Sequence, residues 1–198
     1  WNKPKDSVLY ARDGFVIVAL SWIVLSLFGA LPFFLSGCIP NYVDALFETV
    51  SGFTTTGASI LPSVEDMPRS VNLWRCLSNW IGGMGVLVFV LAVMPKQDMK
   101  SSRLVHVMRA EMPGPVVDKI VPKVKNTAKI LYLIYIAMTA VMTVMLCFGG
   151  MDLFESLTHA FGTAGTGGFG IRGDSLGSYS PYCQWVITVF MLLFGVNF

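Results

Sequence analysis

Long apolar runs separated by short polar segments make up most of the chain, and this alternation is typical of a protein that crosses a lipid bilayer. Three runs occupy residues 15–35, 73–94 and 127–148, and a fourth occupies 184–198. A helix needs about 20 apolar residues to cross the hydrocarbon core. The first three runs reach that length and the fourth falls short of it, so the pattern predicts three full membrane helices and one incomplete helix.

The polar segments that follow the first and third runs share a second pattern. YVDALFETVSGFTTTGASIL follows the first run, and GGMDLFESLTHAFGTAGTGGFGI follows the third. In each segment an Asp stands close before Leu-Phe-Glu, a short apolar helical stretch continues, and the helix then breaks into Thr and Gly. The chain therefore contains an internal repeat of about 110 residues, in which a span, a half-helix, a loop and a second span follow one another.

This repeat divides the chain into three parts. Residues 1–95 form the first repeat, residues 96–126 form a basic connector, and residues 127–198 form a second repeat whose last span is incomplete. The connector is predicted to be a loop with one short amphipathic helix over 101–111. Three interpretations of it stay open: contact with anionic lipid head groups, docking of a cytoplasmic regulator, or a plain positively charged loop.

Composition and charge agree with a membrane protein and indicate its orientation. Hydrophobic residues make up 54% of the chain and charged residues 13%, whereas a soluble domain carries about 25% charged residues. The net charge of +2 gives no indication of nucleic-acid binding. Eleven of the 14 Lys and Arg residues lie before the first span or between the second and third, the side that we assign, with the N-terminus, to the cytoplasm. Seven of the 12 acidic residues lie on the other side, where they concentrate cations.

The two Thr/Gly loops predict a cation site. Irregular backbone at membrane depth is tolerated only where it is buried in protein or lines a water-filled cavity. Each loop follows a half-helix that starts outside, so the negative end of the helix dipole points into the membrane and stabilises a cation there. Gly57 can adopt a positive φ, which allows successive carbonyl oxygens to point inward and replace the hydration shell of an ion.

Three segments carry a resemblance to a known family. TTTGAS at 54–59, WRCLSNWIGGMGVLVFVLAVMP at 74–95 and HAFGTAGTGGFGIRGDS at 159–175 are similar to the Trk/Ktr/HKT superfamily of potassium transporters, in particular its bacterial Trk-type branch. The resemblance implies an all-α membrane fold of tandem span–half-helix–filter loop–span repeats, a potassium-channel-like pore module. It also implies a multi-pass protein of the bacterial plasma (inner) membrane that transports potassium, needs no cofactor and is not an enzyme.

The same resemblance implies the partners and the ion ligands. The family forms homodimers, often gated by a cytoplasmic nucleotide-binding regulatory subunit, and four repeats surround one pathway. Gly57 matches the first filter glycine, with the carbonyls of Thr55 and Thr56 as potassium ligands. For the second filter two registers compete, with either Gly165 or Gly168 opposite Gly57. We favour Gly168, with Thr166 and Gly167 as carbonyl donors, because it needs only about one extra turn in the second half-helix.

This chain departs from the family in carrying only the first two repeats, the second one incomplete. We expect a piece of a four-repeat pore rather than a ring assembled from two copies. A non-conducting structural or regulatory subunit is the main rival. A membrane enzyme is disfavoured because, with Arg75 assigned to the outer side and Lys129 to the connector, the spans hold no ionisable residue. The G-x-G-x-x-G pattern at 165–170 lacks the preceding strand of a dinucleotide site.

The ionisable residues of the half-helices have structural interpretations beside the functional ones. Asp44 and Asp152 are predicted to be N-caps. Glu48 and Glu155 follow Leu-Phe in equivalent positions, and we expect them to bond free amides early in each helix, with attraction of cations as the alternative. His159 is expected to be a hydrogen-bonded structural residue rather than a proton relay.

Small residues of the spans have similar double interpretations. Gly82, Gly83 and Gly85 are expected to permit close helix packing rather than to form a hinge, and Asn79 and Trp80 are placed near the outer interface. The four cysteines form no CxxC pair, and free thiols that pack as small apolar groups are favoured over a disulfide. These cysteines are Cys38, Cys76, Cys147 and Cys183.

Overall fold

The computed structural model describes residues 11–85 and 124–195, and its regular elements in these ranges are all helices. In chain order they are α1 Ala11–Gly29, α2 Leu31–Leu35, α3 Tyr42–Phe53, α4 Arg69–Gly83, α7 Val124–Phe148, α8 Leu153–Ala164 and α9 Pro181–Gly195. Two stretches, Val16–Leu35 and Lys129–Phe148, are long and apolar enough to cross a membrane, and Pro181–Gly195 is a shorter apolar helix. The expected helix at 101–111, with nearly all of the basic connector, lies outside the described residues, as do positions 86–94 of the second predicted span.

The first predicted span is divided into α1 and α2 at Ala30. Pro32 explains the break, because proline has no N–H to continue the helical ladder. Two carbonyls at the break accept hydrogen bonds from side chains of other elements: the Tyr42 hydroxyl donates to Leu27 O over 2.8 Å, and Trp74 Nε1 donates to Gly29 O over 2.9 Å. Side chains thus bond two of the carbonyls at the interruption, as membrane depth favours.

The two half-helices, α3 and α8, are 12 residues long each. Asn41 caps α3, its side chain accepting from the Val43 amide over 3.0 Å. Asp152 caps α8 and forms a capping box with Glu155. The prediction of an N-cap is thus confirmed for Asp152 and wrong for Asp44, which lies in the first turn of α3. Both helices have the same length, but Leu-Phe-Glu lies at 46–48 within α3 and at 153–155 at the start of α8. Helix α8 therefore has the expected extra turn between this triplet and its end.

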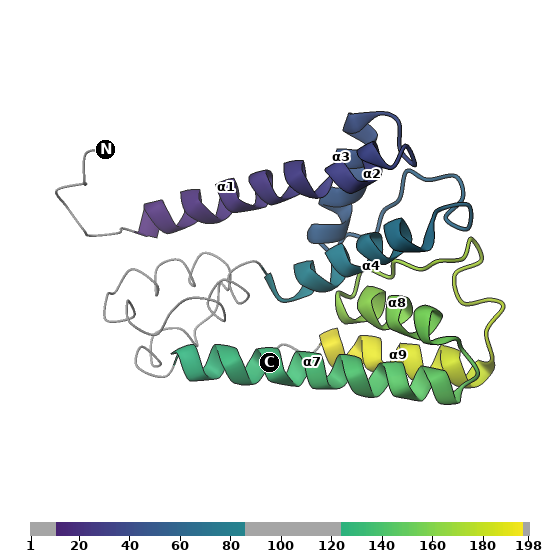
Figure 1. Cartoon of the computed structure of the whole chain (residues 1–198). Helices are drawn as coiled ribbons and strands as arrows, with labels where there is room; N and C mark the ends of the chain where they lie inside the picture. Colours follow the sequence, from purple (N-terminus) through teal and green to yellow (C-terminus); the bar gives the residue numbers. More distant parts are fainter. Residues whose placement is uncertain (1–10, 86–123, 196–198) are drawn as a thin grey trace.

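Helix α4 joins the two repeats. Figure 1 shows it between the half-helices, with α3 on one side and α8 on the other, and it packs extensively against both. Glycines make this approach possible: a Cβ on Gly82 would lie 2.8 Å from the backbone carbon of Phe53, and one on Gly83 would lie 2.8 Å from Cα of Gly165. The close-packing interpretation is confirmed for these two glycines.

The second repeat packs around α8 in the same way. Helices α7 and α9 both contact α8 and each other, and Figure 1 shows α7 and α9 running alongside one another. Their shared core includes Met142, Leu146, Ile187 and Phe190, all buried. All four cysteines are free thiols, and two of them, Cys76 and Cys183, are buried.

Candidate functional site

The two Thr/Gly loops begin where the half-helices end. Loop 1, residues 54–60, follows α3, and loop 2, residues 165–171, follows α8. In each case carbonyl groups of the last helical turn accept hydrogen bonds from amides of the loop that follows. The negative end of the helix dipole therefore lies at the loop. The structure therefore brings the two predicted site segments to equivalent places in the two repeats.

Each loop alternates the handedness of its backbone in the same way. Thr55 and Gly57 have φ of 56° and 74°, and Thr166 and Gly168 have φ of 57° and 77°. The residue between the members of each pair does not have a positive φ. A β-branched residue with positive φ is a genuine outlier, so two such threonines in equivalent places mark backbone strain of the kind that gathers at functional sites.

Hydrogen bonds fix the register of the two loops. The Gly57 amide donates to Ser51 O over 3.4 Å, and the Gly168 amide donates to Gly162 O over 3.0 Å. Gly57 and Gly168 stand 111 positions apart, as do their acceptors. Gly165, the other glycine considered from the sequence, is instead the C-cap of α8 with φ −74°. The backbone therefore pairs Gly168, and not Gly165, with Gly57.

Six carbonyls of these loops have no hydrogen-bond donor among the described residues. Among residues 11–85 and 124–195, no donor bonds the carbonyl oxygens of Thr55, Thr56, Gly57 or of the equivalent Thr166, Gly167 and Gly168. The next carbonyl in loop 1 is different, because the Ser51 hydroxyl donates to Ala58 O over 2.5 Å. A run of three carbonyls without protein partners in each loop is what a ligand with several coordination positions requires.

The two loops touch at their central residues. A Cβ added to Gly57 would lie 2.7 Å from the carbonyl carbon of Gly167 and would overlap its oxygen. A Cβ added to Gly168 would meet nothing within 4 Å. Gly57 is therefore needed both for its positive φ and for contact between the loops, whereas Gly168 is needed only for its φ.

Behind loop 1 lies a buried ion pair. Glu48 of α3 is fully buried, and Arg75 of α4 is 3% exposed. Arg75 Nε lies 2.5 Å from Glu48 Oε1. The other carboxylate oxygen accepts from the Ile60 amide over 3.0 Å, and the Ser59 hydroxyl donates to Glu48 Oε1 over 3.0 Å. The carboxylate thus holds the end of loop 1 rather than amides at the start of its own helix.

The same arginine reaches loop 2. Arg75 Nη1 donates to Gly170 O over 2.8 Å, and its guanidinium carbon lies 3.9 Å from the centre of the Phe169 ring. The spans were expected to hold no ionisable residue, with Arg75 assigned to the outer side. Arg75 is buried in the second turn of α4, the helix that contains the first part of the second predicted span, so the expectation of spans without ionisable residues is wrong.

Asn79, one turn further along α4, supports loop 2 from behind. It is fully buried, and its Nδ2 donates to Gly162 O over 2.9 Å, the same carbonyl that accepts from Gly168. Its side chain also packs against Gly167: a Cβ added to Gly167 would lie only 2.8 Å from Asn79 Nδ2. Asn79, expected near the outer interface, is thus enclosed within the protein behind loop 2.

A more exposed network lies beside the second half-helix. Arg172 Nη2 lies 3.0 Å from Glu155 Oε1, and the two side chains are 38% and 22% exposed. Arg172 Nε donates to the Tyr179 hydroxyl over 2.9 Å, and that hydroxyl hydrogen-bonds His159 Nε2 at 3.3 Å. Partial burial, with the Glu155 carboxylate nearby, raises the pKa of Tyr179, so the phenol stays protonated at neutral pH. His159 has the hydrogen-bonded structural environment that was expected.

The register overturns one further expectation. The equivalence of Glu48 and Glu155 rested on the shared Leu-Phe-Glu triplet. A spacing of 111 residues instead pairs Glu48 with His159 and Asp44 with Glu155. The N-caps Asn41 and Asp152 obey the same spacing, so the triplets are displaced from each other by four positions, close to one helical turn.

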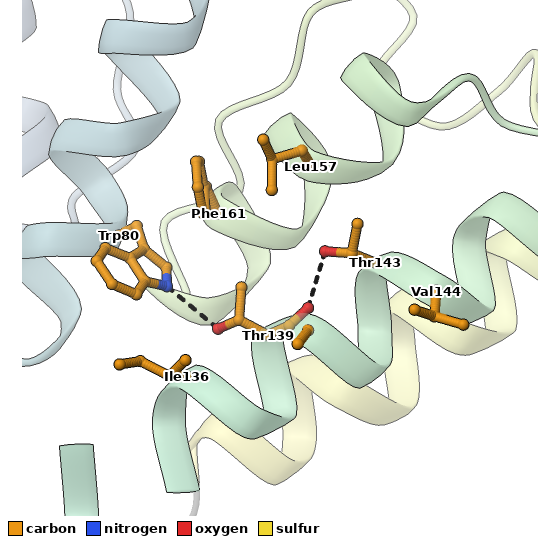
Figure 2. A pocket seen from close by; sticks show the side chains of 8 residues that line it. Trp80, Ile136, Thr139, Thr143, Val144, Leu157 and Phe161 are labelled. Atoms are coloured by element: carbon orange, nitrogen blue, oxygen red, sulfur yellow. Dashed lines mark hydrogen bonds between the residues drawn. The ribbon is translucent and has the colours of Figure 1, made fainter. Parts of the chain in front are cut away.

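An apolar groove lies on the other side of α8, away from the loops. Figure 2 shows Trp80 of α4 at one end, with Leu157 and Phe161 of α8 facing Ile136 and Thr139 of α7. Trp80 Nε1 donates to Thr139 Oγ1 over 3.1 Å, so the polar atoms at that end bond each other. The groove offers an ion no set of free oxygens, and the candidate ion site stays with the loops.

Comparisons with known proteins identify the relatives of this chain. The family model TrkH, described as a cation transport protein, matches residues 1–198. The Trk system potassium uptake protein TrkH of Escherichia coli K12 is 40% identical over 201 residues, which is 100% of this chain and 41% of that protein. The Trk system potassium uptake protein TrkG of the same strain is 36% identical over 203 residues, with the same coverage.

A solved structure agrees with these relatives. The crystal structure of the potassium transporter TrkH from Vibrio parahaemolyticus superimposes with a TM-score of 0.78 at 32% sequence identity, and the match covers 100% of this chain and 39% of that one. The chain therefore spans about two fifths of the length of the relatives it matches.

Proposed function

The chain belongs to the TrkH family of cation transport proteins, and from that premise we propose that its two loops supply two strands of a potassium selectivity filter. The ligands would be the main-chain carbonyls of three residues in each loop. These residues are Thr55, Thr56 and Gly57 in loop 1 and Thr166, Gly167 and Gly168 in loop 2. The protein would carry no cofactor, and potassium would be its transported ion.

One observation carries this proposal: two strained, equivalent backbones each present three carbonyls without a donor among the described residues. A cation that leaves water loses its hydration shell, and carbonyl oxygens held at the right spacing replace that shell. The ends of α3 and α8 add the negative ends of two helix dipoles at the same place. No cationic side chain of the described residues stands unpaired beside the loops, because Arg75 is neutralised by Glu48.

Two strands do not surround an ion, so the pathway needs two more. By family resemblance we propose four strands around one pathway, a homodimer of complete proteins, and a cytoplasmic nucleotide-binding regulatory subunit that controls the pore. The protein would lie in the bacterial inner membrane with its N-terminus in the cytoplasm. The missing strands would come either from the rest of the complete gene product or from a second copy of this chain.

Uptake of ⁸⁶Rb⁺ into liposomes tests the proposal. One sample holds the 198-residue chain and a parallel sample holds the complete gene product. Uptake only by the complete gene product would assign the missing strands to it, and uptake by both would assign them to a second copy. No uptake in either sample would support the rival, a non-conducting subunit of a transport complex.

Substitution of Gly57 links the uptake to the loops. We expect Gly57→Ser to lower the ratio of K⁺ to Na⁺ permeability, because a side chain at φ 74° strains loop 1 and meets the backbone of Gly167. Gly37→Ser is a matched control, since Gly37 has the same φ of 74°, has nothing within 4 Å of its Cβ position and lies outside both loops. An unchanged ratio in Gly57→Ser would count against the assignment of the filter.

A further inference from the structure

We propose that Arg75 is a positioning residue that sets the distance between the two filter strands and thereby the selectivity for potassium. This inference rests on the proposed function. Arg75 lies on α4 and coordinates no ion itself. Its proposed role is to connect the two loops, and so the two repeats, at the filter. Three contacts of one guanidinium group carry the argument.

The first contact leads to loop 1 through a carboxylate. Arg75 Nε bonds Glu48, and Glu48 in turn accepts from the Ser59 hydroxyl and the Ile60 amide. Ser59 stands two positions after Gly57. The arginine is therefore joined to the backbone of loop 1 by a single intermediate group, and that group is fully buried.

The other two contacts lead directly to loop 2. Arg75 Nη1 donates to Gly170 O over 2.8 Å, and the guanidinium carbon lies over the ring of Phe169. Gly170 stands two positions after Gly168, the same distance along the chain as Ser59 from Gly57. Arg75 thus holds equivalent points of both loops, one through Glu48 and one directly.

Few other contacts can fix the distance between the two loops. In the part of the chain that the structure describes, no hydrogen bond joins loop 1 directly to loop 2, and Gly57 lies in van der Waals contact with the carbonyl group of Gly167. Van der Waals contact alone resists displacement weakly, whereas hydrogen bonds to a charged group are stronger and directional. The spacing of the strands therefore depends on the arginine more than on the loops themselves.

The geometry requires arginine and not only a positive charge. The planar guanidinium directs Nε and Nη1 to different partners, while its carbon lies over the aromatic face of Phe169. A lysine at position 75 has one compact ammonium group, which can pair with Glu48 and cannot also hold Gly170 O and cover Phe169. Arg75→Lys therefore separates the positioning role from the charge.

The test uses the complete gene product in proteoliposomes, with the K⁺/Na⁺ permeability ratio and maximal ⁸⁶Rb⁺ uptake as readouts. We expect Arg75→Lys to keep measurable uptake and to lower the ratio about tenfold, the factor that corresponds to the loss of one hydrogen bond to a charged group. The control is Arg172→Lys, which alters the exposed pair with Glu155 and touches neither loop contact. A purely structural role would lower uptake and leave the ratio unchanged.

A second pair of variants keeps the test decisive if Arg75→Lys does not assemble. Phe169→Leu removes the aromatic face and leaves the ion pair intact, and Phe169→Tyr restores the face. We expect the ratio to fall in the first and to return in the second. A wild-type ratio in both Arg75→Lys and Phe169→Leu would overturn the inference. If Gly57→Ser lowers the ratio in the same assay, only this inference fails, and if Gly57→Ser has no effect the proposed function fails with it.

Discussion

The two repeats share a backbone and differ in what supports it. Their half-helices have equal length, their caps and loop glycines keep one spacing, and both loops place a threonine and a glycine at positive φ. The side chains behind the loops are different: loop 1 is backed by the buried pair of Glu48 and Arg75, while the position of Glu48 is taken by His159 in the second repeat. Similar loop conformations can therefore be held by unrelated contacts.

The two repeats also differ in which of them supplies the supporting side chains. Both loops are supported by α4, through Arg75 for loop 1 and for Gly170, and through Asn79 for the end of α8. Helix α9, the corresponding span of the second repeat, contains no charged residue. The first repeat therefore supplies polar support to both loops, and the second repeat depends on its neighbour. Variants made in pairs, one in each repeat, measure this difference.

The largest difference in stability is expected between substitutions of the two glutamates that pair with arginine. Glu48→Gln leaves the buried Arg75 charge without a carboxylate to balance it, at a cost of about 3–5 kcal/mol. In Glu155→Gln, Arg172 remains accessible to water, so the change is much smaller. Thermal unfolding in detergent, followed by circular dichroism, measures both. Equal shifts in Tm would contradict the contrast between a buried and an exposed pair.

The next largest difference in stability is expected between substitutions of the two loop glycines. Gly57→Ala combines an unfavourable φ with overlap against Gly167, and we expect it to cost about 2–4 kcal/mol. Gly168→Ala meets open space and bears only the cost of its φ, about 1 kcal/mol. The same unfolding measurement, combined with ⁸⁶Rb⁺ uptake, compares the two. A larger effect of Gly168→Ala would show that the contact between the loops is unimportant.

The smallest difference lies at the N-caps. Asn41→Ala removes one hydrogen bond to the Val43 amide and is expected to cost about 1 kcal/mol. Asp152→Ala removes a capping box and a negative charge at a helix N-terminus, which adds about 0.3–1 kcal/mol. Asp44→Asn serves as the comparison, because Asp44 is in the first turn of α3 and does not cap it, so the substitution removes only a charge worth about 0.3–1 kcal/mol. A clearly larger loss of stability in Asp44→Asn than in Asn41→Ala would restore Asp44 as a capping residue.

A wrong equivalence between the repeats shows where local patterns mislead. The Leu-Phe-Glu triplets at 46–48 and 153–155 match in sequence, yet they do not occupy equivalent positions of the half-helices. Relative to the start of its helix, one triplet is displaced by about one turn from the other. A slip of four residues leaves the same helix face apolar, so the hydrophobic pattern cannot detect it. The caps and the positive φ values detect it, because each marks one residue rather than a face.

The sequence by itself determined the half-helices, the Thr/Gly loops and the two apolar stretches long enough to cross a membrane, since these follow from apolar length and from residues that end helices. It also singled out Gly57, and it favoured Gly168 because this register needs one extra turn after Leu-Phe-Glu, a turn that α8 has. Only the tertiary structure decided the partners of Arg75 and the burial of Asn79. Arg75 meets Gly170, 95 positions away along the chain, and such a contact depends on how α4 packs between α3 and α8. Local sequence patterns carry information on the conformation of a segment, and the choice among distant partners is made by the packing of whole helices.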